Sequence, residues 1–399
     1  MSSSIFHYAS WVIAGKSCQI AVAFFTQLFI ARYIAPDELG RFGFLFATLS
    51  FWQMLFSLRL PLQVIQSPIP LETPLYLNAA IQEGLFATAS LGLPFLLYEP
   101  STDLILLLLA TFLWRIAEVM KAFQERQTEH PALLRLESAG QIGANLIALF
   151  FAWLTETGYW ILILREWLAA LFLLFPLFAR EKAHFQWRWL TKNDWIQLIQ
   201  AGRPFWKDGL FEQGMIRLSL ICIRVFSGQA IAGHYYQALR FISLPHGHFG
   251  SLINRYAFHL FAQAKSSSER RAIYKQIFTF SVIPLGLLSL LAMWKGKELL
   301  LFFLGPSWEI ATEMAQYMAG GLLFMTLFSL EKMFLLSHVD SHPQLFRARL
   351  FQMAGIPWLF LPFPNPSLLG LSFTISYLFA FLSTRHSIYR IKTVESPAI

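Results

Sequence analysis

Apolar stretches of about 20 residues recur along the chain, and short polar segments separate them. A helix of that length covers the roughly 30 Å of hydrocarbon in a bilayer. Each stretch is predicted to be helical, because an open sheet in lipid would leave backbone groups without hydrogen-bond partners. The predicted spans lie at approximately 9–32, 41–60, 77–98, 103–125, 131–154, 158–180, 205–227, 233–262, 272–294, 309–336, 344–363 and 367–388.

Two of these spans contain residues that interrupt helices. The eighth is long, and we expect it to be tilted or broken at Pro245-His246-Gly247. The eleventh ends among Pro357, Pro362, Pro364 and Pro366, so its boundary is the least sharply defined.

The pattern around the first two spans occurs again about 190 residues later. In the first copy an apolar helix ends at Arg32, a polar turn containing Pro36 follows, and Gly40 opens the next helix. In the second copy Arg224 and Gly233 hold the corresponding places.

A second pair of segments repeats in the same order. Residues 121–135 (KAFQERQTEHPALLR) and 332–347 (KMFLLSHVDSHPQLFR) share Lys-x-Phe, His-Pro, Leu and Arg. The two repeated patterns predict two halves of similar design. We therefore expect an N-terminal six-helix lobe at 1–180, a cytoplasmic amphipathic linker at 181–204 and a C-terminal six-helix lobe at 205–399. The predicted fold class is all-α: a polytopic membrane protein of about 12 transmembrane helices in two pseudo-symmetric lobes.

Composition agrees with a membrane protein. Of 399 residues, 56% are hydrophobic and only 14% are charged, and the mean hydropathy is +0.51. Soluble domains average about 25% charged residues. The net charge of +8 does not indicate nucleic-acid binding, because the basic residues lie between apolar spans. Cys18 and Cys222 both fall in apolar spans, so neither a disulfide framework nor a metal site is indicated, and we expect no cofactor.

Basic residues also predict the orientation. They gather in 121–135, 180–207, 263–275, 331–349 and the C-terminal tail, whereas the alternate loops carry few. By the positive-inside rule these segments and both termini lie in the cytoplasm. The start of the chain lacks the basic region of a cleavable signal peptide, so we expect the first span to be retained. Tryptophans and basic residues alternate within 180–207, which is typical either of a segment on anionic headgroups or of a plain linker with an aromatic belt.

Charges near the bilayer centre are the first functional candidates, because each costs roughly 2.5–3.5 kcal/mol to insert. Arg115 lies near the middle of the fourth span and Arg217 near the middle of the seventh. Glu118 is one turn from Arg115, so a structural i,i+3 pair is an equally good interpretation. Taken alone, Arg59 is expected to snorkel to the headgroups.

Other polar residues in the spans are candidates for ion coupling. His246 and His248 lie at the predicted break and could titrate near neutral pH, although a membrane histidine is more often a packed hydrogen-bonding residue. Asp208 and Glu212, one turn apart, are alternative proton or cation sites. The candidates for ion coupling are Glu118, Asp208, Glu212, His246 and His248. Walker A, Gly-x-Ser-x-Gly and His-Glu-x-x-His patterns are absent from the sequence, so we do not expect an enzyme.

Three motifs resemble those of bacterial polysaccharide (O-antigen and capsule) flippases, within the multidrug/oligosaccharidyl-lipid/polysaccharide exporter (MOP) superfamily. They are residues 31–43 (ARYIAPDELGRFG), 233–238 (GHYYQA) and 305–308 (GPSW). The resemblance implies alternating access that moves an undecaprenyl-diphosphate-linked oligosaccharide across the bacterial inner membrane for cell-surface polysaccharide, such as the O-antigen of lipopolysaccharide. It implies membrane lipids, and other polysaccharide-assembly membrane proteins, as partners.

In that family basic residues of a central cavity bind the diphosphate. The residues that correspond here, together with the mid-span Arg115, are Lys16, Arg59, Arg115, Arg217, Arg240 and Arg255. The chain departs from many members where Ser219 replaces an Asp. Two alternatives remain. A multidrug exporter of the same superfamily would favour buried carboxylates, and a polymerase or ligase of lipid-linked glycans would be expected to carry a large external loop.

Overall fold

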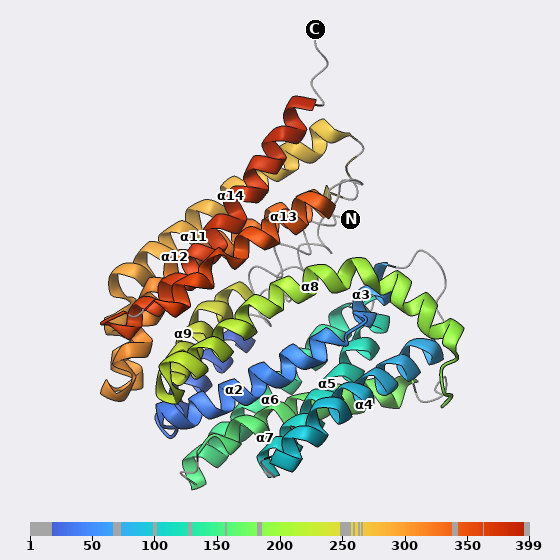
Figure 1. Cartoon of the computed structure of the whole chain (residues 1–399), viewed down its shortest axis with the longest axis horizontal. Coiled ribbons are helices and arrows are strands. Elements are labelled where there is room, and N and C mark those ends of the chain that lie inside the picture. The colour runs from blue at the N-terminus through green and yellow to red at the C-terminus, as the bar shows by residue number, and fades with distance from the viewer. Residues whose placement is uncertain are drawn as a thin grey trace. The chain divides into compact units, whose positions relative to one another are not determined.

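The computed structural model describes residues 18–66, 73–98, 102–126, 130–155, 158–181, 186–247, 257, 260–261, 264, 266–336, 342–361 and 363–394. All regular secondary structure in these residues is helical (Figure 1). The chain forms two compact units, and two helices contribute to both: α2 (Pro36–Leu55) and α8 (Lys192–Ser227).

The first unit contains the described residues up to Ile34 and those of Leu45–Arg217. It begins with an apolar helix at Cys18–Ile30. Besides its parts of α2 and α8, its helices are α3 (Leu60–Gln66), α4 (Thr73–Tyr98), α5 (Thr102–Arg126), α6 (His130–Thr155) and α7 (Trp160–Glu181). The α5 helix packs against α3, α4 and α7, and α6 packs against α7.

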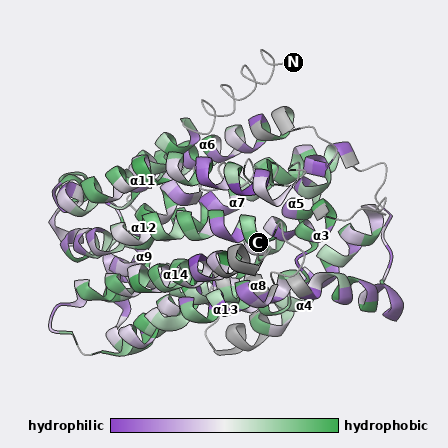
Figure 2. Cartoon of the chain, turned by 90° about the horizontal axis from the view of Figure 1, so that it is seen from above, coloured by the Kyte–Doolittle hydropathy of each residue, from purple (hydrophilic) through white to green (hydrophobic). Residues whose placement is uncertain are grey.

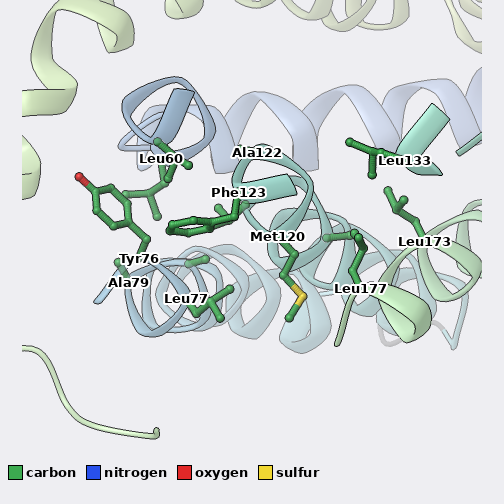
Figure 3. Packing of buried hydrophobic residues seen from close by; sticks show 14 of the residues in the cluster. Leu60, Tyr76, Leu77, Ala79, Met120, Ala122, Phe123, Leu133, Leu173 and Leu177 are labelled. Carbon is green, nitrogen blue, oxygen red and sulfur yellow. The ribbon is translucent and has the colours of Figure 1, made fainter. Parts of the chain in front are cut away.

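The hydrophobic core of this unit lies around α5 (Figure 3). Ala117, Met120 and Phe123 recur at every third position and are almost fully buried, together with Leu77 of α4 and Leu177 of α7. This spacing places one apolar stripe along a helix face. Burial of that stripe fixes the rotation of α5 and so positions the polar residues beside it.

An extended segment before α8 is attached to α4 by two side-chain amides. Asn78 donates to the carbonyl of Gln186 (2.7 Å) and accepts from the N–H of Arg188 (3.3 Å). One turn later Gln82 donates to the carbonyl of Arg188 (2.9 Å) and accepts from the N–H of Leu190 (3.3 Å). The two amides therefore supply the hydrogen bonds that a neighbouring strand would otherwise provide.

The predicted second span is broken between α2 and α3, and side chains satisfy the backbone groups that the break frees. The indole of Trp206 donates to the carbonyl of Leu55 (3.0 Å). The N–H of Leu58 donates to Glu83 Oε2 (3.1 Å), and its carbonyl accepts from Gln63 Nε2 (2.6 Å). A broken helix at membrane depth is tolerated where its backbone is buried in protein or lines a cavity.

The second unit contains the described residues of Ala35–Phe44 and Leu218–Ile399. Its further helices are α9 (Gln229–Pro245), α11 (Ser267–Leu304), α12 (Glu309–Leu336), α13 (His342–Gln352) and α14 (Leu371–Val394). The α12 helix packs against α9, α11 and α14, and most of its residues are buried. The α11 helix is largely hydrophobic (Figure 2) but exposes Phe280, Leu290 and Phe302, as expected of a surface that faces lipid.

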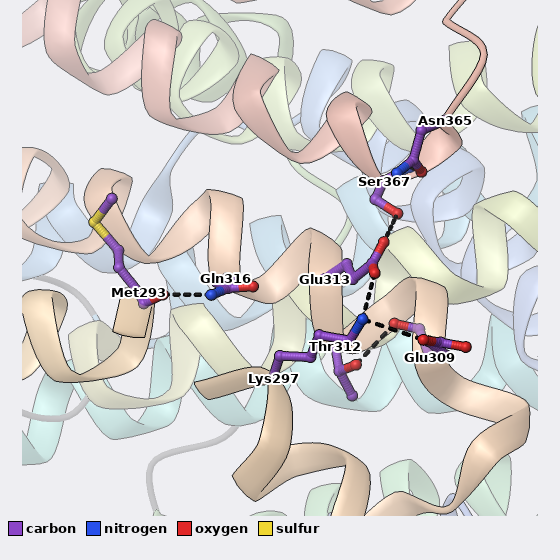
Figure 4. A network of polar contacts seen from close by, with 8 residues as sticks. All are labelled: Met293, Lys297, Glu309, Thr312, Glu313, Gln316, Asn365 and Ser367. Carbon is purple, nitrogen blue, oxygen red and sulfur yellow. Dashed lines mark hydrogen bonds and ion pairs between the residues drawn. The ribbon is translucent and has the colours of Figure 1, made fainter. Parts of the chain in front are cut away.

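A polar network joins α11, α12 and the segment before α14 at one end of this unit (Figure 4). Lys297 pairs with Glu313 (2.5 Å) and Glu309 (3.1 Å), and the Ser367 hydroxyl donates to the other oxygen of Glu313 (2.6 Å). The Ser367 N–H is in turn held by Asn365. The network links segments 294–309 and 363–367, two of the alternate loops that carry few basic residues and are predicted to lie outside the cytoplasm, which is consistent with their lying on the same side of the membrane.

The turn at 305–308 packs against a second motif that the sequence singled out. Gly305 has φ 91°, a left-handed conformation that glycine adopts without strain. Trp308 ends a 3-10 turn, is 1% exposed and meets the ring of His234 edge-on at 5.5 Å. These residues therefore hold the start of α12 against α9.

Several predicted boundaries differ from the structure. The α8 helix begins at Lys192 and runs without interruption through the predicted seventh span. The eleventh span is helical only to Gln352 and then continues as 3-10 turns, in keeping with its prolines. The α9 helix ends at Pro245 and a π turn follows at 246–247, while the rest of the predicted eighth span lies mostly outside the described residues, so its break stays a prediction. In the described residues, five helical runs have the length and apolar character to cross a membrane: Arg135–Thr155, Trp160–Arg180, Ser267–Leu304, Pro306–Leu336 and Pro366–Tyr389.

Candidate functional site

The first unit contains an open cavity of about 380 Å³ beside the break between α2 and α3. Its wall combines apolar and polar side chains from α2, α3, α4, α5, α7 and α8. It is lined by Phe46, Ser50, Gln53, Met54, Ser57, Arg59, Leu60, Pro61, Ala80, Glu83, Thr111, Trp114, Arg115, Glu118, Val119, Glu166, Gln213 and Arg217. Three arginines and three glutamates are among them, so the formal charge of the lining is balanced.

Arg115 is held from two sides. Its guanidinium forms an ion pair with Glu83 of α4 and donates to the backbone carbonyl of Gln53. The side chains of Arg115 and Glu83 are 15% and 6% exposed, so the pair is largely screened from water. Charge-assisted hydrogen bonds of this kind are strong where water is excluded.

The direct ion pair of Arg115 is with Glu83, whereas one interpretation of the sequence placed Glu118 there. Glu118 lies one turn along the same helix and is exposed, and it forms no hydrogen bond with the described residues. Glu118 still interacts electrostatically with Arg115, so the i,i+3 interpretation holds as a weaker interaction beside the ion pair that Glu83 forms from a neighbouring helix.

Arg59 lies in the break itself. Its φ of 55° is left-handed, a conformation that is strained for a residue other than glycine. The side chain occupies the space beside Gly209 of α8, where any Cβ would coincide with the guanidinium. Within the described part of the chain, that guanidinium makes one hydrogen bond, to the sulfur of Met54 at 3.9 Å. Arg59 therefore presents a charge to the cavity and forms no ion pair with a described carboxylate, although Glu118 lies near enough to interact with it electrostatically.

Arg217 approaches from α8. Its guanidinium lies over the ring of Phe46, 4.9 Å from the centroid, in cation–π geometry. Glu166 of α7 also lines the cavity and pairs with its neighbour Arg165 at 2.5 Å. The wall thus places guanidinium groups from the break, α5 and α8 around one hollow.

None of the other predicted site residues is among the described side chains that line this cavity. Arg240 and His246 belong to the second unit, where Arg240 lies over the ring of Tyr236 (5.6 Å) and His246 hydrogen-bonds to Thr326 (3.1 Å). Asp208 and Glu212 lie on α8, but their side chains are outside what the structure describes. Lys16, His248 and Arg255 also lie outside the described residues.

Glu83 and Glu166 were not among the candidates from sequence. Each is a carboxylate inside an apolar span, so the cost argument that selected Arg115 applies equally to both. In the described part of the chain, no group of three or more His, Cys, Asp or Glu side chains could hold a metal ion.

Comparison with known proteins gives the family and the fold. The family model for "Polysaccharide biosynthesis protein" matches residues 29–313, well over half of the chain. No curated protein matches the sequence. Among solved structures, an inward-facing multidrug resistance MATE family transporter of the MOP superfamily has a TM-score of 0.68 at 10% identity, covering 96% of each chain.

Two further structures are similar. The lipid II flippase MurJ, in an inward closed conformation, has a TM-score of 0.68 at 12% identity, covering 95% of this chain and 87% of its own. A MOP superfamily transporter from Pyrococcus furiosus has a TM-score of 0.57 at 10% identity, covering 97% and 96%. The predicted all-α, polytopic membrane fold class is confirmed. The chain belongs to the polysaccharide biosynthesis protein family, and its fold is that of the MOP superfamily.

Proposed function

We propose that this protein moves an undecaprenyl-diphosphate-linked oligosaccharide from the inner to the outer leaflet of a bacterial inner membrane by alternating access. The observation that carries the proposal is the arginine-lined cavity of the first unit. A diphosphate has to cross about 30 Å of hydrocarbon, and guanidinium groups offer it charge-assisted hydrogen bonds on the way. Membership of a polysaccharide biosynthesis family supports the glycan as cargo.

Arg59 and Arg217 are the groups best placed to receive the diphosphate. Arg59 forms no ion pair with a described carboxylate that lines the cavity, and Arg217 reaches the same cavity from α8 over the ring of Phe46, whereas Arg115 is already paired with Glu83. Arginine suits this role because its planar fork matches phosphate geometry. The proposed orientation has both termini in the cytoplasm, on the basis of the basic segments between spans.

A second candidate function is multidrug export. Glu118 lines the same cavity and forms no hydrogen bond with the described residues, so its carboxylate could receive a cationic drug. Arg59 forms no ion pair with a described carboxylate and Glu83 is already paired with Arg115, so the cavity offers an unpaired guanidinium to an anion, and we favour the anionic cargo.

The test is translocation by purified protein in proteoliposomes that contain a fluorescent undecaprenyl-diphosphate oligosaccharide. We expect Arg217→Ala to abolish its appearance in the opposite leaflet while expression and insertion stay normal. Arg203→Ala is the matched control, because Arg203 is an exposed arginine of the same helix that does not line the cavity.

In cells, deletion should cause lipid-linked repeat units to accumulate on the cytoplasmic side. Normal surface polysaccharide in cells that carry Arg217→Ala would show that Arg217 is not needed for cargo binding. Drug hypersensitivity with normal glycan after deletion would favour the exporter.

A further inference from the structure

We propose that, in the absence of cargo, the Glu83 carboxylate occupies the position that the cargo's diphosphate takes when it binds. Binding of the diphosphate displaces this carboxylate, which then takes up one proton. This inference rests on the proposed function, since it assumes an anionic ligand in the cavity of the first unit.

The two donors that hold Glu83 form an anion-binding set. One carboxylate oxygen pairs with Arg115, and the other accepts the N–H of Leu58 at 3.1 Å. A guanidinium together with a backbone N–H is the combination that proteins use to bind phosphate groups. Leu58 lies between Ser57 and Arg59, which both line the cavity, so an anion there can reach the same donors.

The Leu58 N–H is also one of the groups freed by the break between α2 and α3. The group that binds these two donors therefore affects the helix break. While Glu83 accepts the N–H of Leu58, this hydrogen bond connects α4 to the break. An anion that replaces the carboxylate removes the connection. The carbonyl of Leu58 stays fixed by Gln63 in either case.

Displacement requires a proton because Glu83 is only 6% exposed. A carboxylate that loses its guanidinium partner and a backbone donor in such a place cannot stay ionised without a large desolvation cost. The cargo and ionised Glu83 compete for Arg115, whereas protonated Glu83 does not compete. Binding should therefore tighten as the pH falls. The other charged groups that face this cavity are Arg59, Arg217, Glu118 and Glu166, with Arg165 beside Glu166.

The test uses purified protein in nanodiscs and a short-chain dialkyl diphosphate diester, a probe whose charge does not change between pH 5.5 and 8.5. Calorimetry in buffers of different ionisation enthalpy measures both affinity and proton uptake. In the wild-type protein we expect uptake of about one proton per bound probe, and an affinity that rises up to about tenfold for each unit decrease in pH. An infrared difference spectrum should show the carbonyl band of a newly protonated carboxylic acid.

Glu83→Gln should bind the probe with no proton uptake and an affinity independent of pH. Glu83→Asp keeps the titrating group and should shift the infrared band, which tests the assignment if the glutamine variant does not fold. Glu137→Gln is the matched control, because Glu137 pairs with Lys121 between α5 and α6, away from the cavity, and its removal should leave the uptake unchanged.

Three outcomes would overturn the proposal. Probe binding without proton uptake would reject the role of Glu83 and leave the proposed function standing. Loss of uptake in Glu118→Gln or Glu166→Gln, with uptake retained in Glu83→Gln, would assign the proton elsewhere. Failure of the wild-type protein to bind the probe at any pH would reject both this inference and an anionic cargo at this site.

Discussion

Gly40 and Gly233 lie against one another, although they are far apart in the sequence. A Cβ built on Gly40 would meet the carbonyl of Gln229 and lie 3.0 Å from the nitrogen of Gly233. A Cβ built on Gly233 would meet the carbonyl of Pro36 and lie 2.9 Å from the nitrogen of Gly40. The glycines that hold corresponding places in the repeated pattern are therefore in mutual contact, where the first turns of α2 and α9 pack backbone to backbone.

This contact predicts that Gly40→Ala or Gly233→Ala forces the two helices apart. The obstructing atoms belong to the backbone, so no side chain can move aside to make room. We expect each substitution to cost about 1–3 kcal/mol of stability, the range for overpacked sites. The measurement is the apparent melting temperature of the purified protein.

Gly286→Ala is the control for the glycine substitutions. A Cβ at Gly286 of α11 would meet no atom within 4 Å, and alanine is the better helix former. The melting temperature of this variant should stay the same or rise. A comparable decrease in all three variants would show that close approach is not the cause.

A second prediction concerns Gly209, which leaves room for the guanidinium of Arg59. In Gly209→Ala the new methyl group should displace that guanidinium, which is the far end of a flexible side chain. We expect folding to be retained and cargo transport to fall as far as in Arg59→Ala. The double variant Gly209→Ala/Arg59→Ala should be no worse than either single one, because both act on one group.

Gly214→Ala provides the matched control for Gly209→Ala. It lies on the same helix, and its Cβ would make only ordinary contacts, 3.5 Å from Phe51 and 3.8 Å from Met54. Transport by this variant should be close to that of the wild-type protein. Equal loss in both glycine variants would argue against a specific effect on Arg59.

A third prediction concerns the amide side chains that hold residues 186–190. Asn78→Ala removes two hydrogen bonds to the segment, so the carbonyl of Gln186 and the N–H of Arg188 lose their partner and must be hydrated instead. We expect the segment to detach and trypsin to cleave after Arg188 faster than in the wild-type protein. Asn193→Ala, at an exposed position early in α8, should leave the cleavage rate unchanged. An unaltered rate in Asn78→Ala would show that the attachment does not depend on this amide.

The sequence predicted the helical, membrane-spanning character of the chain because long apolar stretches have one solution in lipid. It also identified Gly40 and Gly233 as corresponding positions. The contact between the two glycines could not be predicted from the sequence, because a repeated pattern shows that two segments are similar but not how close they lie.

The break between α2 and α3 was not predicted, because residues 56–60 (FSLRL) remain mostly apolar across it. Its stability depends on donors and acceptors from distant helices, Trp206 and Glu83 among them. Pro61, at the second position of α3, was the local signal that a helix starts there. Glu83 lies in an apolar span like Arg115, but its ion pair with Arg115 depends on how α4 packs against α5, and no local pattern in the sequence records that packing.

The last prediction concerns Glu331, a fully buried carboxylate of α12. It accepts from the hydroxyl of Tyr274 of α11 (2.8 Å) and from Thr384 of α14, and Arg385 of α14 pairs with it at 3.3 Å. Arg385 itself is 46% exposed. Glu331→Ala should cost about 3–5 kcal/mol, because it removes the acceptor that joins three helices and leaves their donors buried.

Arg385→Ala should cost much less, because Glu331 keeps both hydroxyl donors and water can reach the vacated position. Glu298→Ala, which breaks an exposed pair with Lys295 on α11, should leave the stability nearly unchanged. Among the purified variants, Glu298→Ala should therefore have the highest apparent melting temperature, Arg385→Ala an intermediate one and Glu331→Ala the lowest. If Arg385→Ala lowers the melting temperature as far as Glu331→Ala, the charge pair and not the hydroxyl donors holds this end of the unit together.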